Sequence, residues 1–328
     1  MSPISMVWRW AAALVLAAAG AVAPGHTQSD YPSRGITLVM PLAPGSAGDV
    51  LGRLVANKMS AELGRSIVVE NVTGASGAIG IDRVNRSDPD GYTVLGTGDN
   101  QLIYAVHFNK SAKFDPLKDF TPVTQLATID WALVANPALP AKSVAELVAL
   151  AKAKPGQIDF SSGGKGSAQH IAMELFMAKT GVKLNHVPYR GATPALNDVV
   201  SGVVSTMFTA LSVAQPFIQN GTLRVLASAG TKRSDLMPEV PTLAEAGVDG
   251  FEFTTWMGFL LPAKTPPEVV KRVHASAVSA LNDPEVRARS VASGFTVVGN
   301  TPDEFKAVVA RDFERIGDII RSAGITAN

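Results

Sequence analysis

Two glycine-containing segments of the chain could bind an anion. The first is residues 45–49 (GSAGD), which connects a predicted strand to a predicted helix. Glycine lets the backbone turn sharply and approach a ligand closely, and a helix start offers unpaired N–H groups at the positive end of a dipole. We therefore expect Gly45, Ser46 and Asp49 to contact an anionic ligand. Asp49 could instead cap the helix or fix the loop through its amides. The alternative is a plain tight turn.

The second segment, residues 160–170 (FSSGGKGSAQH), has the same layout. A predicted strand runs into glycines, and a helix is expected to start at Ser167. The Gly-Lys-Ser/Thr triplet of a Walker loop is missing, and so is a dinucleotide fingerprint. We expect Gly166, Ser167 and His170 to offer amides and side chains to a carboxylate. Two such loops could face each other across a cleft and hold one anion between two helix starts.

Catalytic and metal chemistry is poorly supported by the same residues. His170 and Glu174 are four residues apart, a spacing that can hold zinc on a helix, but no third ligand or His-Glu-x-x-His pattern accompanies them. A structural hydrogen bond is the preferred interpretation. Ser167 lacks the Gly-x-Ser-x-Gly context of a hydrolase nucleophile, and the chain has no cysteine. We predict no catalytic residue, no metal and no cofactor.

Polar residues at the ends of other predicted strands complete the candidate site. Tyr189 could line the cleft with its ring, and Arg190 could attract an anion. A solvated loop charge is an equal alternative for Arg190. Thr97 and Asp99 follow a strand of the first half, and we expect them to rim the same cleft from the other side.

The elements that must position these residues alternate between strand and helix. The first series begins with a strand over residues 36–42 and a helix over 50–63. A second series begins after Pro137 and includes a strand over 158–161 and a helix over 167–179. Such alternation favours parallel strands with crossover helices. We predict an α/β fold of two open-sheet domains that form a clamp with a central cleft.

A helical block ends the chain, over residues 267–282, 284–292 and 302–323. We expect this block to pack on the first domain, so that the chain crosses between domains twice, near 126–131 and near 251–258. Two crossings leave a hinged cleft, which is a common place for a ligand. The predicted limits are 29–127 with 252–328 for domain 1, and 128–251 for domain 2.

The first 28 residues are predicted to be an export signal. Arg9 precedes an apolar run over residues 11–23, which is shorter than the roughly 20 residues that a bilayer requires. Residues 21–23 fit the small-x-small cleavage pattern. We expect residues 1–28 to be removed; an N-terminal anchor helix is the alternative.

Composition limits the partners. A length of 328 residues favours two domains. The chain has 29 basic and 28 acidic residues, and removal of Arg9 with the signal leaves it formally neutral. No basic cluster suggests a nucleic acid, and no later segment is long and apolar enough to enter a membrane. The mature chain is expected to bind no nucleic acid and to insert into no membrane.

The sequence resembles a known family, the periplasmic receptors of tripartite tricarboxylate transporters, of the Bordetella-uptake-gene (Bug) type. The resemblance covers essentially the whole chain after the signal. Besides the two loops, its motifs are 31–34 (YPSR), 74–80 (GASGAIG), 90–92 (DGY), 188–191 (PYRG), 238–242 (PEVPT), 256–258 (WMG) and 262–266 (PAKTP).

The resemblance implies a monomeric periplasmic solute-binding protein, not an enzyme. It would bind a small carboxylate and deliver it to the membrane permease subunits of a tripartite tricarboxylate transporter. The two loops would hold the proximal carboxylate, partly through water. Ser46 departs from the family, which has a second glycine there, and we expect this change to alter the ligand. Asp99 would place an acidic side chain in a site that receives carboxylates, which is unusual. It could instead bind a hydroxyl, amide or amino group at the ligand's far end.

Two other functions remain open at the level of sequence. One is a secreted enzyme that transforms a carboxylate in the same cleft, which would require a nucleophile with its base or a metal cluster. The other is a ligand sensor that reports to a signalling partner. Turnover of a bound carboxylate would favour the first.

Overall fold

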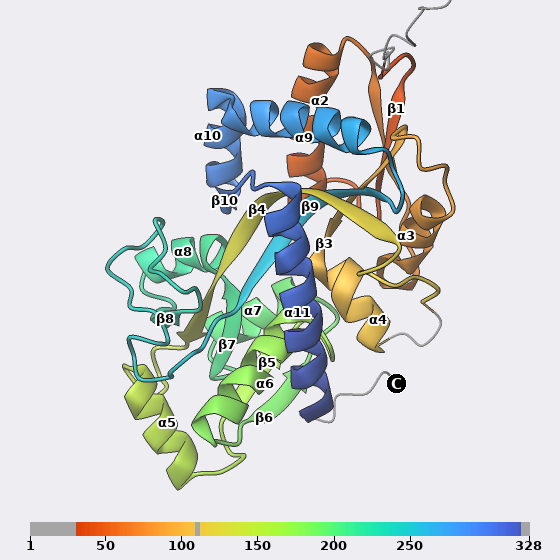
Figure 1. Ribbon diagram of the computed structural model, residues 1–328. Coiled ribbons are helices and arrows are strands. Elements are labelled where there is room, and N and C mark those ends of the chain that lie inside the picture. Colours follow the sequence, from red (N-terminus) through yellow and green to blue (C-terminus); the bar gives the residue numbers. More distant parts are fainter. Residues whose placement is uncertain (1–30, 109–111, 323–328) are drawn as a thin grey trace, which may run out of the picture.

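The computed structural model describes residues 31–108 and 112–322, so the predicted signal peptide lies outside the described residues. The chain forms two α/β bodies joined by two long strands (Figure 1). The strands of the first sheet are, in spatial order, β2 (Ile67–Asn71), β1 (Ile36–Met40), β3 (Thr93–Gly98), β9 (Thr254–Pro262) and β4 (Phe120–Ala135), with β10 (Phe295–Val297) also on β4. The strands β2, β1 and β3 are parallel, and β9 runs antiparallel to β3 and β4.

The second sheet starts from the same β4. Its other strands are β7 (Thr206–Ala210), β5 (Asp159–Ser162), β6 (Asn185–Pro188) and β8 (Arg224–Ser228), of which β7 and β8 pair antiparallel with β4. Residues 120–130 of β4 pair with β9 in the first sheet, and residues 131–135 pair in the second. The chain therefore passes between sheets inside one strand of 16 residues. The predicted domain limits stay a prediction.

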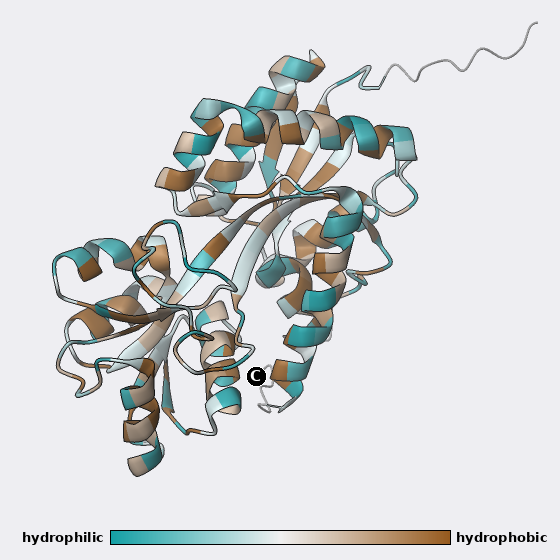
Figure 2. Cartoon of the chain, turned by 60° about the vertical axis from the view of Figure 1, so that its left-hand side comes forward, coloured by the Kyte–Doolittle hydropathy of each residue, from teal (hydrophilic) through white to brown (hydrophobic). Residues whose placement is uncertain are grey.

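The helices cover both sheets. In chain order they are α2 (Ala47–Leu63), η2 (Ala75–Gly77), α3 (Ala78–Asn85), η3 (Asn100–Tyr104), α4 (Ala105–Phe108), α5 (Val144–Ala153), α6 (Ala168–Thr180), α7 (Ala192–Val200), α8 (Leu211–Gln219), α9 (Pro267–Asn282), α10 (Pro284–Ala292) and α11 (Pro302–Ser322). Apolar residues gather on the helix faces that meet the sheets, and polar residues on the outer faces (Figure 2). In the described residues, no helix is long and apolar enough to span a bilayer.

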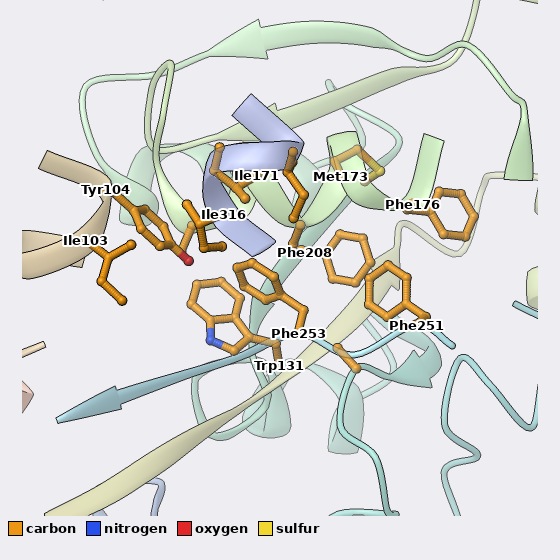
Figure 3. Packing of buried hydrophobic residues seen from close by; sticks show 14 of the residues in the cluster. Ile103, Tyr104, Trp131, Ile171, Met173, Phe176, Phe208, Phe251, Phe253 and Ile316 are labelled. Atoms are coloured by element: carbon orange, nitrogen blue, oxygen red, sulfur yellow. The ribbon is translucent and has the colours of Figure 1, made fainter. Parts of the chain in front are cut away.

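The helix α11 contacts both bodies. It lies against β4 and η3 of the first body and against α6 of the second. One hydrophobic cluster accordingly runs across the junction, and Figure 3 shows Tyr104 of η3, Ile316 of α11 and Ile171 of α6 gathered near Trp131. The two bodies therefore share a core in this conformation.

The predicted alternation of strands and helices is confirmed. Helices α9 and α10 have the expected limits, whereas α2 begins three residues earlier than expected because Ser46 caps it. The helices η3, α4 and α8 were not expected. The first of these, η3, is a π-helix, a form that often marks functional sites.

Candidate functional site

The first candidate loop is a capped helix start. Gly45 has a positive φ of 76°, a conformation that favours glycine. Ser46 is the N-cap of α2, and its Oγ accepts the N–H of Asp49 at 3.4 Å. The Asp49 carboxylate in turn accepts the N–H of Gly45 at 2.9 Å. These reciprocal bonds leave the first two helical N–H groups without an intrahelical acceptor.

The second candidate loop repeats this geometry at the start of α6. Gly166 also has a φ of 76°. Ser167 is the N-cap, its Oγ accepts the N–H of His170 at 3.4 Å, and the His170 Nδ1 accepts the N–H of Gly166 at 3.0 Å. The dihedral angles of the two cap serines agree within a few degrees, −65° and 156° against −67° and 159°. Each serine is half-buried and can still donate its hydroxyl proton.

Asp49 holds the first loop from inside. Its side chain is buried and also accepts hydrogen bonds from Arg53 Nε at 3.0 Å and Asn71 Nδ2 at 2.8 Å. Burial alone would raise the pKa of Asp49, but the bonds from Arg53, Asn71 and Gly45 lower it below its ordinary value. Of the roles expected for Asp49, the helix cap belongs to Ser46. These contacts favour holding the loop over direct contact with a ligand anion.

His170 plays the corresponding part in the second loop. Because its Nδ1 accepts the Gly166 N–H, the proton of the neutral ring is on Nε2, which lies 3.3 Å from Glu174 Oε1. The ring stacks on His186 with centroids 4.0 Å apart. Burial first, then the charges of His170 and Lys165, lowers the pKa of His186 to about 4. Within residues 31–108 and 112–322, no cluster of three His, Cys, Asp or Glu residues could hold a metal.

Tyr189 and Arg190 lie beside the second loop. A Cβ added to Gly164 would come within 3.3 Å of the Tyr189 carbonyl oxygen, which shows how closely the two segments pack. The Tyr189 hydroxyl donates to Asp198, and this bond raises the pKa of Tyr189 to about 12. That hydroxyl is therefore engaged, while the Arg190 side chain is exposed.

Thr97 and Asp99 are near the first loop, but both side chains are buried. Thr97 is fully buried within β3, and its hydroxyl donates to the Gly98 carbonyl at 3.3 Å. Asp99 begins η3. A Cβ on Gly98 or on Gly48 would meet the same Met257 sulfur, at 3.5 and 3.0 Å. The end of β3 and the start of α2 therefore share a neighbour, which places Asp99 close to the first loop.

Three residues that support the loops were not predicted. Arg53 and Asn71 hold Asp49, and His186 supports His170. Arg53 could have been found, since it follows Asp49 by four residues on one helix. Asn71 and His186 lie on other strands, and no local pattern connects them to the loops.

A separate cavity of about 210 Å³ lies on β4 and β9, the two long strands that join the bodies. None of the predicted site residues lines it. Its charged lining residues are of both signs: Asp130, Lys232, Arg233, Asp235, Glu252 and Arg311. This balance gives no preference for an anion, so the two loops remain the candidate carboxylate site.

The chain is similar to known proteins over most of its length. Residues 51–325 match the family model described as the tripartite tricarboxylate transporter family receptor. The chain is 33% identical over 312 residues to Protein BugT of Bordetella pertussis, with 95% of each chain covered.

Two solved structures are similar over nearly the whole chain. A TctC solute binding protein from Polaromonas, solved without ligand, superposes with a TM-score of 0.81 at 30% identity, covering 89% of this chain and 99% of that one. The R. palustris protein Rpa4515 with adipate has a TM-score of 0.74 at 31% identity, covering 91% and 100%. These likenesses confirm the predicted two-domain clamp fold.

Proposed function

Since the chain belongs to the tripartite tricarboxylate transporter receptor family, we propose that it captures a small carboxylate in the periplasm and delivers it to the permease subunits of such a transporter. The family and the fold are those of solute-binding proteins. The proposal concerns the ligand class, the compartment and the permease partner.

The matched geometry of the two loops is the observation that supports this proposal. Each loop presents two helical N–H groups and one serine hydroxyl, and each is held by an acceptor at the third helical position. An anion between two helix starts would receive donors from both bodies. A hydrogen bond to a charged group contributes about 1.5–3 kcal/mol, so several together give useful affinity. The adipate bound to Rpa4515 is a carboxylate of this kind.

A thermal-shift screen tests the proposal. The chain without residues 1–28 is mixed with mono-, di- and tricarboxylates and amino acids, and with uncharged amides as controls. A ligand at 100 times its Kd should add about 2.7 kcal/mol to the free energy of unfolding. The double variant S46A/S167A should lose most of this shift. Turnover of a carboxylate, or no shift with any of them, would contradict a receptor of this class.

A further inference from the structure

The acceptor that closes the first loop keeps its protonation state near neutral pH. The Asp49 carboxylate accepts the Gly45 N–H at 2.9 Å, and Arg53, four residues later on α2, pairs with it at 3.0 Å. Burial alone would raise the pKa of this carboxyl group, but the hydrogen bonds that it accepts hold it below its ordinary value. The first loop therefore keeps its acceptor between about pH 5 and 8.

The second loop has a titratable acceptor at the equivalent position. The His170 Nδ1 accepts the Gly166 N–H at 3.0 Å, and Glu174, four residues later on α6, lies 3.3 Å from Nε2. An imidazole nitrogen accepts a hydrogen bond only while it carries no proton, and both nitrogens are donors in the charged ring. Histidine is also the side chain whose charge ordinarily changes between about pH 5 and 8. Protonation of His170 would therefore break the bond that closes the second loop.

The groups around His170 decide what a proton there would do. Glu174 faces its Nε2 and would offset the charge of a protonated ring, so the lost bond determines the effect on a ligand anion. The His186 ring of β6 is stacked on His170, and its pKa is lowered to about 4 by burial, then by the charges of His170 and Lys165, so His186 stays neutral. The other elements packed against α6 present apolar side chains, which are Phe160 of β5, Phe208 of β7 and Ile316 of α11.

The two stacked rings hold the second loop at two points. The His186 Nε2 lies 2.6 Å from the Ser162 Oγ, which also bonds both the N–H and the C=O of Gly164 at 3.1 Å. The His170 ring holds Gly166 directly. Without the bond from Gly166, the free N–H groups at the start of α6 would lose the fixed direction in which we expect them to face a ligand anion.

We propose that His170 makes carboxylate binding sensitive to pH: the second loop holds the ligand while the His170 ring is neutral and releases it when the Nδ1 takes up a proton from solvent. The first loop does not respond, because its acceptor is the Asp49 carboxylate. The inference rests on the proposed carboxylate function, and it adds a regulation of the same site.

Calorimetry with glutarate and adipate at about pH 7.5 and about pH 5.5 tests the release. Affinity should be about five- to tenfold lower in acid. His170→Asn keeps an acceptor that does not titrate, so the loss should be much smaller, as it should in His170→Asp/Glu174→Arg, which copies the first loop. His274→Asn is the matched control, because His274 bonds the Asn300 carbonyl outside both loops, and it should keep the wild-type loss. Titration of the ligand affects all the proteins equally.

Amide hydrogen exchange in the ligand-free wild type gives a second measurement that depends on no variant. Followed by NMR, the protection of the Gly166 N–H should fall in acid relative to that of Gly45. A constant ratio would overturn the proposal. Equal or higher affinity in acid, or the same loss in wild type and His170→Asn, would also overturn it, and the carboxylate function would stand. If no carboxylate of the wider screen binds at either pH, both proposals fail.

Discussion

Ser167 has two roles with different energetic consequences. It caps α6, as the sequence predicts, and we expect its free hydroxyl proton to reach the ligand carboxylate. The cap bond supports folding, whereas the second bond would support binding only. The two roles can therefore be separated by measuring stability and affinity on the same variant.

Ser167→Ala should weaken carboxylate binding by about ten- to a hundredfold, because it removes a hydrogen bond to a charged group. The free energy of unfolding should fall by no more than about 1 kcal/mol, as for a lost helix cap. Calorimetry and denaturant unfolding measure the two effects. Ser143→Ala is the matched control, since Ser143 caps α5 away from both loops. Equal affinities for the Ser167 variant and wild type would show that Ser167 is only a cap.

The lowered pKa of His186, which lies against the second loop, predicts that the protein loses stability in acid. Its pKa falls from 6.5 to about 4 in the fold, so the unfolded chain binds the proton more readily between these values. The contribution of the neutral His186 ring to the free energy of unfolding is therefore fully present above pH 6.5. It is lost as the pH falls toward 4. His186→Gln cannot titrate and should flatten the loss, as thermal melts at half-unit pH steps would reveal. An unchanged slope in the variant would contradict a role for His186.

At the scale of the element, the first loop depends on a left-handed glycine. A Cβ on Gly45 would meet no atom within 4 Å, so a substitution there acts only through the backbone. Relief of the strain would rotate the Gly45 N–H away from Asp49 and move the free N–H groups of α2. A side chain at a left-handed glycine far from the loop would cause the same backbone strain but would leave the free N–H groups of α2 in place.

Gly45→Ala and Gly64→Ala form the matched pair. Gly64 ends α2 with a φ of 64° and also has open space at its Cβ. Each change should cost about 1–2 kcal/mol of stability. Only Gly45→Ala should also lower carboxylate affinity, by about tenfold. Similar affinities for the two variants would mean that the first loop does not bind the ligand.

At the scale of the whole molecule, the shared core ties the two bodies together. The cluster that contains Tyr104, Trp131, Ile171 and Ile316 draws residues from both sheets, and β4 pairs in both. Neither body can unfold without exposing part of this cluster. The two bodies should therefore unfold together.

We expect a single unfolding transition, although chains of two domains often show more. Differential scanning calorimetry should give one peak whose calorimetric and van't Hoff enthalpies agree. Intrinsic tryptophan fluorescence should report the same midpoint as circular dichroism. Two resolved peaks would indicate that the shared cluster contributes little.

The sequence by itself determined the features that depend on nearby residues. The alternation of strands and helices, the family, and the helix start at Ser167 could all be predicted, because glycine conformations and capping bonds act over a few residues. The cap of the first helix was expected at Asp49 and lies at Ser46. The roles of Gly45 and Gly166 belong to the same group. These local rules also indicated that two similar loops start two helices.

Only the tertiary structure decided the environment of each side chain. It buried Asp99 beside Asp312, which is more than two hundred positions away in the sequence, and it engaged the Tyr189 hydroxyl with Asp198. It also joined two sheets through one strand. Nothing in the residues around Asp99 specifies a partner on α11, because burial and charge pairing depend on which distant surfaces pack together.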